Sequence, residues 1–416
     1  MNAGNKLIIS GVYYSGGGLS NVMAQLARHL GSYFEVVCLG FVPSGMLLPQ
    51  DPVPGCRFIP VPANRNGFIV KDRELLRNLV EVEQFSNILL LGPVHLNRSF
   101  IKQLQPFNIC LTAYTAYEGK MKKDYDLADI AQLDRCIFYT QYNHQCYTEM
   151  LAGNGSAPEI LNKSGFVAHG TACDVFYPVH GERAAKKKLA RKQVYPGKQF
   201  TEDAFIILNI NRPYLRKRLD ISLAAFKLFS AGKKNVFLHF HLGTTNQSEA
   251  DELQRQIDEA GLQQQVFLTY SADQKTSYKE EWVNLLYNAC DVGMTTSMGE
   301  GWGMGLFEHA ATYAPVIAPE HTSFIENWEG TGMLVPTSDT QFVFYENADM
   351  FIVRADDMAQ ALHLLYSDEE LYDRVAERCY RHATSAKFKW ENTAAYFAKT
   401  ISAAAHSTEN KNLINE

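Results

Sequence analysis

Short apolar runs alternate along this chain with longer segments in which apolar residues recur every three or four positions. The short runs predict β-strands, and the longer segments predict amphipathic helices. Strands are predicted over residues 6–10, 34–39, 57–61, 88–91, 108–112, 137–140, 204–209, 236–242, 266–270, 291–295, 332–335 and 351–353. Helices are predicted over residues 73–83, 99–104, 219–230, 249–260, 282–288, 356–365, 369–383 and 390–405. Strands alternating with helices are typical of a parallel sheet covered on both faces.

The alternation is interrupted once, at a polar and basic stretch that contains RAAKKKLARK. We therefore predict an α/β fold of two Rossmann-like, doubly wound domains. The predicted parts are an N-terminal domain over 1–178, a linker over 179–198, a C-terminal domain over 199–386, a helix over 390–405 and a polar tail over 406–416. The basic linker could make a weak contact with anionic lipid, or its charges could simply be solvated.

Composition narrows the class of protein. The 416 residues are 46% hydrophobic and 12% aromatic, enough for two separate cores. A net charge of -6 argues against bulk affinity for nucleic acid, although a local basic patch stays open. No apolar run reaches the roughly 20 residues of a membrane span, and the first ten residues lack the regions of a secretion signal. The eight cysteines form no CxxC pair, so we expect buried thiols in a reducing cytoplasm.

The most informative stretch covers residues 295–319 and reads TTSMGEGWGMGLFEHAATYAPVIAP. It begins where a predicted strand ends, and glycines stand at 299, 301, 303 and 305 before a helix-like pattern. Backbone N–H groups of such a loop can approach a ligand closely, and a helix start favours a phosphate. Glu300 and Glu308, eight positions apart, could hold two separated pairs of hydroxyls, as in a nucleotide sugar. The alternative is a glycine-rich turn before a core helix, with both glutamates solvated.

A second glycine loop lies near the start of the chain, where Gly16, Gly17 and Gly18 precede a predicted helix. It offers another anion site, although it lacks the GxGxxG spacing. Further along, Tyr117 and Glu118 follow the strand predicted at 108–112. Ligands of doubly wound sheets bind beyond the carboxyl ends of the strands, so these two side chains fall on the functional rim. An ordinary solvated glutamate is the alternative for Glu118.

The loop NRPYLRKRLD follows the first strand of the predicted C-terminal domain. Arg212 and Lys217, five positions apart, could grip one diphosphate, with Arg216 and Arg218 as reserves. Fixed cations stabilise the charge that develops on a leaving diphosphate. A surface salt-bridge cluster is the alternative. No HExxH motif, CxxC pair or convincing DxD-like pair is present, so we expect no required metal.

With these motifs the sequence resembles the retaining GT-B glycosyltransferases of the large Glu-x7-Glu family, the glycosyl transferases group 1. Glu300 and Glu308 match that motif, and Arg212 and Lys217 match the family's Arg-x4-Lys pair. The resemblance implies that the helix at 390–405 crosses back to the N-terminal domain. Many members carry a histidine near the strand at 108–112, where this chain has TAYTAYEG, so Glu118 or Tyr117 is the substitute candidate near the acceptor.

The resemblance assigns roles to these residues. Arg212 and Lys217 would grip the donor diphosphate, Glu300 the hydroxyls of the transferred sugar, and Glu308 the ribose. The predicted catalytic residues are Glu300, Lys217, Arg212 and Glu118. The predicted donor-binding residues are Gly17, Gly18, Arg212, Lys217, Gly243, Glu300, Gly301, Gly303, Met304, Gly305, Leu306 and Glu308. The base is expected to be read by backbone groups near 242–244 and 270–272, which leaves UDP, GDP and ADP open.

The residues and the resemblance together predict a cytoplasmic, metal-independent enzyme that moves a sugar from a nucleoside-diphosphate sugar to an acceptor hydroxyl. The resemblance further implies that the anomeric configuration is retained. Retention in this family needs no protein base, because the leaving phosphate can take the acceptor's proton. Two alternatives stay open: a phosphorylase or sugar-nucleotide epimerase, and an inactive GT-B scaffold that binds glycans or partners. A dinucleotide oxidoreductase is disfavoured, since neither half has GxGxxG followed by an acidic residue.

Overall fold

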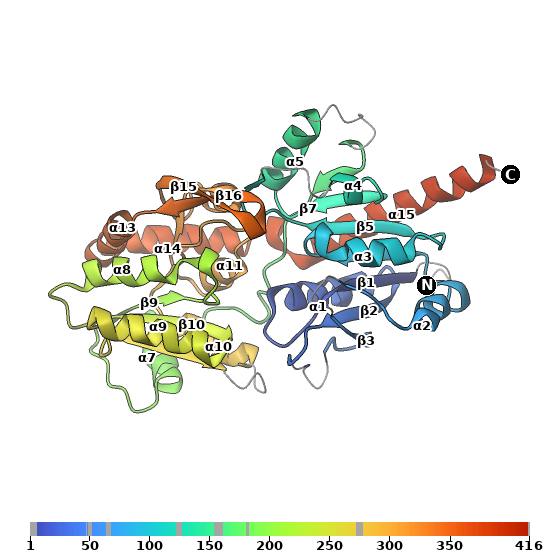
Figure 1. Cartoon of the computed structure of the whole chain (residues 1–416). Coiled ribbons are helices and arrows are strands. Elements are labelled where there is room, and N and C mark those ends of the chain that lie inside the picture. Colours follow the sequence, from blue (N-terminus) through green and yellow to red (C-terminus); the bar gives the residue numbers. More distant parts are fainter. Residues whose placement is uncertain are drawn as a thin grey trace. The chain divides into compact units, whose positions relative to one another are not determined.

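The computed structural model describes residues 6–46, 48, 52–63, 68–121, 127–153, 161–179, 183–271 and 278–414. The chain forms two compact units (Figure 1). Unit 1 comprises Met1–Tyr117, Met121–Gly170 and Lys387–Glu416, and unit 2 comprises Glu118–Lys120 and Thr171–Ala386. Each predicted domain thus corresponds broadly to one unit, but the short segment 118–120 belongs to unit 2 although it lies within the first third of the chain.

Unit 1 is built on a parallel sheet in the order β3-β2-β1-β4-β5-β7-β8. Its strands are β1 (Lys6–Val12), β2 (Glu35–Val42), β3 (Arg57–Pro62), β4 (Asn87–Leu91), β5 (Cys110–Thr115), β7 (Arg135–Phe138) and β8 (Ser164–Phe166). Every residue of β4 is buried, as expected for a strand covered by helices on both faces. The strand order reverses between β1 and β4, which makes their carboxyl ends the switch point of this sheet.

The helices of unit 1 include one that comes from the far end of the chain. They are α1 (Gly18–Leu30), α2 (Arg73–Arg77), the π-helical turn η1 (Asn78–Val82), α3 (Val94–Leu104), α4 (Leu127–Ile130), α5 (Gln141–Gly153) and α15 (Trp390–Ile414). Helix α15 packs against α1 and β5 (Figure 1). The Thr393 hydroxyl donates to the carbonyl of Ala168 (2.9 Å), and Phe397 packs edge-on against Tyr114. The C-terminal helix therefore belongs to the first unit, as the GT-B resemblance implies.

Helix α15 also extends beyond its predicted end. Residues 406–414, predicted as part of a polar tail, continue the helix, and 415–416 lie outside the described residues. Polar composition carries no tertiary signal, but this stretch contains neither glycine nor proline, so nothing in it terminates a helix.

Unit 2 contains a parallel sheet in the order β11-β10-β9-β12-β13-β14. Its strands are β9 (Phe205–Asn209), β10 (Val236–Thr244), β11 (Val266–Ser271), β12 (Val292–Met294), β13 (Val316–Pro319) and β14 (Met333–Val335). Its helices are α7 (Arg183–Val194), α8 (Leu219–Ser230), α9 (Gln247–Ala260), α10 (Glu280–Ala289), α11 (Met304–Ala310), α12 (Thr322–Trp328), α13 (Ala355–Ser367) and α14 (Glu369–Ala383). The Asn246 side chain caps α9 by accepting from the Glu249 N–H (2.9 Å), which sets the start of that helix.

An antiparallel hairpin in unit 2 was only partly predicted. Strand β15 (Thr337–Val343) pairs with β16 (Ala348–Val353) across the turn η3 (Phe344–Glu346), and β6 (Lys120–Met121) is the third strand of this small sheet. Of this hairpin, the sequence predicts only a strand over residues 351–353. Most of β15 is exposed and polar, so it lacks the apolar run that marks a strand.

The predicted linker is also different in the structure. Residues 183–194 form α7, which packs on α10 within unit 2, and Ala190 and Val194 are part of its core. Lys187 and Arg191 are buried and pair with Asp291, Arg191 at 2.7 Å. These two cations face the interior and are not available for lipid head groups. Residues 180–182 of the predicted linker lie outside the described residues.

The buried cluster at Asp291 predicts a large loss of stability on substitution. The Asp291 carboxylate accepts from Lys187, Arg191 and the Ile206 N–H, and these partners lower its pKa despite its burial. Asp291→Asn should lower the free energy of unfolding by about 3 kcal/mol, because two buried cations lose their counter-charge. Urea unfolding followed by circular dichroism measures this. Glu259→Gln, which removes an exposed ion pair with Arg255, is the control and should cost less than about 0.5 kcal/mol. Equal losses in the two variants would refute a special role for the cluster.

Candidate active site

The candidate site forms where two neighbouring strands of unit 2 end. Strands β9 and β12 lie side by side in register, with Leu208 opposite Gly293. Parallel strands end at the same edge of a sheet, so the basic loop after β9 meets the glycine loop after β12. The Met298 N–H donates to the carbonyl of Arg216 (2.8 Å), and the Asn211 amide donates to the Thr295 hydroxyl (3.2 Å). The two loops are thus joined through their backbones as well as their side chains.

Lys217 and Glu300 meet at this junction. The Lys217 ammonium donates to Glu300 Oε1, and Arg216 Nη1 lies 3.4 Å from Glu300 Oε2. The Lys217 and Glu300 side chains are only 12% and 11% exposed. Burial opposes the charge of Glu300, but Lys217 and Arg216 outweigh it and lower its pKa to about 2. Glu300 is therefore an ionised carboxylate at neutral pH, while burial lowers the pKa of Lys217.

Side chains that follow β13 hold the backbone of Glu300 in place. The Glu300 N–H donates to the Thr322 hydroxyl (3.4 Å), and the Ser323 hydroxyl donates to the Glu300 carbonyl (2.7 Å). His321 Nε2 lies 2.7 Å from the Ser297 carbonyl oxygen. Thr322 has a φ of 44°, which is costly for a β-branched residue. Strain of this kind persists only where the surroundings fix it, and it is common at functional sites.

Glu118 lies in this site and not on the sheet of unit 1. Its Oε2 accepts from the Gly301 N–H (3.1 Å) and lies 3.0 Å from Arg216 Nη1. Burial raises the pKa of Glu118 even though Arg216 is adjacent. The other acceptor candidate, Tyr117, is buried in unit 1, where it packs on Phe138. Tyr117 therefore follows β5 within unit 1 as expected, whereas the expectation is corrected for Glu118, because the chain leaves that unit between the two residues. A role for either side chain near the acceptor stays a prediction.

Two glycines of the central loop are explained by the packing. A Cβ on Gly299 would lie 1.8 Å from the carbonyl oxygen of Glu118, so no other residue fits. Gly303 caps α11 with a φ of 93°, a conformation that favours glycine. The density of glycines thus serves close backbone packing around Glu300. Met304, Gly305 and Leu306 form the first turn of α11.

Glu308 stands on α11, apart from the Lys217–Glu300 pair. The Tyr287 hydroxyl of α10 donates to Glu308 Oε2 (2.6 Å). Burial raises the pKa of Glu308 to about 7, and the hydrogen bond from Tyr287 only partly offsets this. A buried carboxylate with one neutral donor has remaining acceptor capacity, which a pair of hydroxyls would satisfy.

The raised pKa of Glu308 predicts how stability depends on pH. Because the native state binds this proton more tightly than the unfolded chain does, the wild type loses stability as pH rises from about 4.5 to 7. Glu308→Gln keeps the acceptor for Tyr287 and cannot ionise. It should be as stable as wild type at pH 4 and more stable by about 2 kcal/mol at pH 8. Chemical unfolding at several pH values tests this, with the exposed Glu329→Gln as control. A difference independent of pH would contradict the assignment.

Four further residues were predicted to bind the donor: Arg212 and Gly243 in unit 2, and Gly17 and Gly18 in unit 1. Arg212 Nη1 lies 3.4 Å from the hydroxyl of Tyr214. Gly243 lies in β10 with a φ of 62°. Gly17 and Gly18 lie in unit 1 at the start of α1, where Gly17 is the N-cap. Of the base-reading segments, Ala272 lies outside the described residues.

Several residues of the site were missed or undervalued. Arg216, treated as a reserve, contacts Glu118, Glu300 and Glu346 Oε1, the last at 3.6 Å from its Nε. Thr322 and Ser323 were not predicted. Thr322 and Ser323 could have been predicted, because the polar run EHTS follows the apolar run VIAP, as polar residues do at the other strand ends. No signal near Glu346 pointed to the site.

The described residues were expected to need no metal and to contain no membrane span. They contain no group of three or more histidine, cysteine, aspartate or glutamate side chains arranged to hold a metal ion. None of the helices described is both long and apolar enough to span a bilayer. The independence from metal stays a prediction.

Comparison with known proteins identifies the domain that carries this site. Residues 191–382 match the model of the family described as glycosyl transferases group 1. This part of the chain is a glycosyltransferase domain. It holds both candidate motifs, from Arg212 to Glu308, and it lies within unit 2. Among curated proteins none matches the sequence closely enough to be a relative.

Solved structures extend the likeness in fold to nearly the whole chain. Sucrose-phosphate synthase from Thermosynechococcus elongatus is 19% identical, with a TM-score of 0.69 over 95% of this chain and 98% of its own. Anabaena HepE in complex with UDP-glucose is 14% identical, with a TM-score of 0.71 over 96% and 99%. The pneumococcal O-GlcNAc transferase GtfA in complex with UDP and GlcNAc is 11% identical, with a TM-score of 0.67 over 97% and 99%. The glycosyltransferase domain is therefore part of a GT-B fold, as predicted.

Proposed function

We propose that this protein is a retaining glycosyltransferase that moves a sugar from a nucleoside-diphosphate sugar to an acceptor hydroxyl. The observation that carries the proposal is the buried Lys217–Glu300 pair at the ends of β9 and β12. A cation and a carboxylate held together at strand ends are the two groups that a diphosphate and a sugar need. The donor class is supported by the UDP-glucose and UDP bound to HepE and GtfA, which share the fold.

When the proposed donor binds, it replaces the ion pair between Lys217 and Glu300 with contacts to the donor. Its diphosphate carries more charge than the Glu300 carboxylate and competes for the Lys217 ammonium, with Arg212 as a second cation. Glu300, released from Lys217, then accepts hydrogen bonds from hydroxyls of the transferred sugar, and Glu308 accepts from the ribose. Because Glu118 and Arg216 remain paired with the same loop, Glu300 keeps its position during this exchange.

The transfer breaks the bond between the anomeric carbon and the β-phosphate oxygen and forms one from that carbon to the acceptor oxygen. The acceptor's proton passes to the departing diphosphate on the same face of the sugar, so configuration is retained. In this mechanism the chain supplies positioning, charge stabilisation and exclusion of water, and it needs no general base or metal. The eight thiols are free, in keeping with a cytoplasmic enzyme that works where nucleotide sugars are made.

Turnover in the presence of EDTA tests the function. The protein is incubated with UDP-, GDP- and ADP-hexoses and a panel of glycan acceptors, nucleoside diphosphate release is followed, and the product linkage is read by proton NMR. We expect release that depends on acceptor and a product with the donor's anomeric configuration. Turnover that requires phosphate or no acceptor would identify a phosphorylase or an epimerase. The absence of any turnover would favour a binding scaffold.

A further inference from the structure

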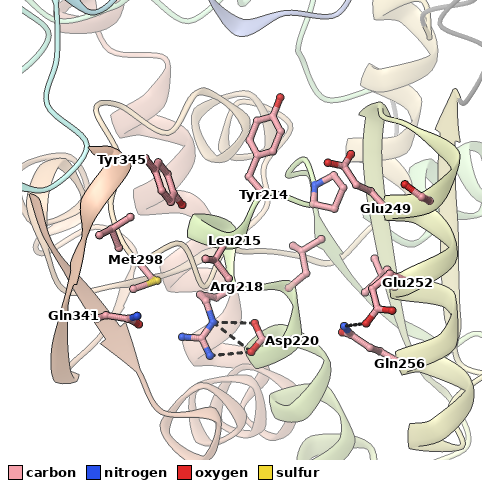
Figure 2. A pocket seen from close by; sticks show the side chains of 15 residues that line it. Tyr214, Leu215, Arg218, Asp220, Glu249, Glu252, Gln256, Met298, Gln341 and Tyr345 are labelled. Carbon is pink, nitrogen blue, oxygen red and sulfur yellow. Dashed lines mark hydrogen bonds and ion pairs between the residues drawn. The ribbon is translucent and has the colours of Figure 1, made fainter. Parts of the chain in front are cut away.

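A cavity of about 630 Å³ opens within unit 2 beside the candidate active site (Figure 2). Three parts of the unit surround it: the basic loop with the start of α8, the helix α9, and the strand β15 with the turn after it. The lining residues are Pro213, Tyr214, Leu215, Arg218, Leu219, Asp220, Ser248, Glu249, Glu252, Leu253, Gln256, Met298, Gln341, Val343 and Tyr345. Its volume is in the range of ligand-binding pockets and is large enough for several linked sugar rings.

The walls combine aromatic rings with hydroxyl-binding groups. In Figure 2, Tyr214 and Tyr345 stand near one end, Gln341 lies on one side, and Glu252 with Gln256 lies on the other. Tyr214 is 49% exposed and Tyr345 62% exposed, so both rings offer faces to a ligand. Aromatic faces pack on the C–H faces of pyranose rings, while carboxylates and amides bind the hydroxyls.

The charge of the cavity excludes other classes of ligand. Arg218 is the lining cation, and its guanidinium is held by both carboxylate oxygens of Asp220 (2.8 and 2.9 Å). Glu249 and Glu252 add further negative charge. Glu252 pairs with Arg255 (2.6 Å), and Glu249 accepts from the Thr245 hydroxyl (2.6 Å). With Arg218 and Arg255 each paired to a carboxylate, the walls offer a phosphate no uncompensated cation, and a purely apolar ligand would strip water from these partly exposed carboxylates. A neutral polyhydroxyl compound can pack its C–H faces on the tyrosine rings and donate hydrogen bonds from its hydroxyls to the carboxylates.

The cavity shares its walls with the candidate active site. Tyr214, Leu215 and Arg218 come from the loop that carries Lys217, and Met298 stands two positions before Glu300. On the other side, Tyr345 belongs to the turn that also places Glu346 at Arg216. A ligand in the cavity therefore contacts the same loops that position the Lys217–Glu300 pair.

We propose that this cavity is a carbohydrate-binding subsite that holds the glycan of the acceptor, away from the reacting hydroxyl. The inference rests on the proposed transferase function and adds the class of acceptor, an oligosaccharide or a molecule that carries one. The hairpin β15–β16 forms one wall of the subsite. Tyr345, in the turn of this hairpin, is too exposed to contribute much to a core, and a role in the subsite accounts for it.

Binding of neutral oligosaccharides to the full chain tests the subsite. Pentasaccharides of glucose, mannose, galactose and N-acetylglucosamine are titrated and followed by saturation-transfer NMR and calorimetry. We expect at least one to bind, and Tyr345→Ala and Glu252→Gln each to weaken it by about tenfold. Phe344→Ala is the matched control, because Phe344 is 82% exposed and does not line the cavity. Binding by none of the four, or equal binding by all variants, would overturn the proposal.

The outcome is separable from that of the proposed function. Nucleotide-sugar binding is measured on the same variants, and we expect Tyr345→Ala and Glu252→Gln to leave it unchanged. If oligosaccharides bind as predicted and no nucleotide sugar does, the subsite stands and the transferase proposal fails. If nucleotide sugars bind and turn over while oligosaccharides do not bind, the transferase stands and the subsite fails.

Discussion

Lys217→Ala should lower kcat/KM for sugar transfer by about 10²- to 10³-fold, the usual effect of removing one fixed charge that stabilises a leaving group. The loss should appear in kcat as well as KM, because the charge on the diphosphate grows as the bond to the sugar breaks. Lys217→Arg keeps the positive charge but replaces the ammonium with a planar guanidinium, so its rate should lie between those of Lys217→Ala and the wild type. Initial rates over a range of donor concentrations measure both constants.

The control for this variant is Lys227→Ala, which removes an exposed lysine from α8 in the same unit. It should keep wild-type constants. Thermal unfolding of Lys217→Ala shows whether the fold is retained, since Arg216 still lies near Glu300 after the substitution. A Lys217→Ala variant that is folded and retains more than about a tenth of the wild-type kcat/KM would contradict the role proposed for the pair.

Arg216→Met should be the most destabilising single change in the site. It leaves Glu118 and Glu346 without their shared cation and Glu300 with Lys217 alone. Removing one partner from a buried charge cluster costs about 3–5 kcal/mol. Arg216 lowers the pKa of both Glu118 and Glu300, so its loss should raise these two pKa values in the native state and leave them unchanged in the unfolded chain. The variant should therefore lose stability as pH increases from 5 to 8, relative to wild type.

A second substitution distinguishes whether Arg216→Met loses stability through unpaired charge or through altered packing. In the double variant Arg216→Met with Glu118→Gln, one of the uncompensated carboxylates is removed, and we expect part of the lost stability to return. Thermal melts at pH 5, 6, 7 and 8 measure the effect. Arg354→Met is the control, because the Arg354–Asp356 pair is exposed. A loss in Arg216→Met that matches the control, or that does not vary with pH, would show that the cluster is not held by charge.

Part of this site was predictable because it follows from the order of strands in a parallel sheet. Arg212, Lys217, Glu300 and Glu308 come soon after two strands whose apolar runs are plain in the sequence, and a doubly wound sheet brings such strand ends to one edge. The meeting of Lys217 with Glu300 follows from that topology. The same reasoning predicted most of the strands and helices, because each has its own periodic signal.

The other part depends on contacts between distant segments, for which no local pattern exists. Glu118 accepts a hydrogen bond from Gly301, 183 positions away, and it reaches unit 2 only because the chain crosses there briefly. The basic helix α7 looked solvated because its partner Asp291 lies about a hundred residues later. Strand β15 has an exposed, polar sequence, so neither the hairpin nor the cavity beside it could be foreseen.

The account depends most directly on a nucleotide sugar binding at the Lys217, Glu300 and Glu308 site. Calorimetric titration of the wild type, Lys217→Ala and Glu308→Ala with UDP-, GDP- and ADP-glucose and their mannose counterparts, in EDTA, measures this. We expect one nucleotide to bind the wild type and each substitution to weaken that binding by at least about tenfold. If no nucleotide sugar binds, or if both variants bind as the wild type does, the donor site proposed for this domain is wrong.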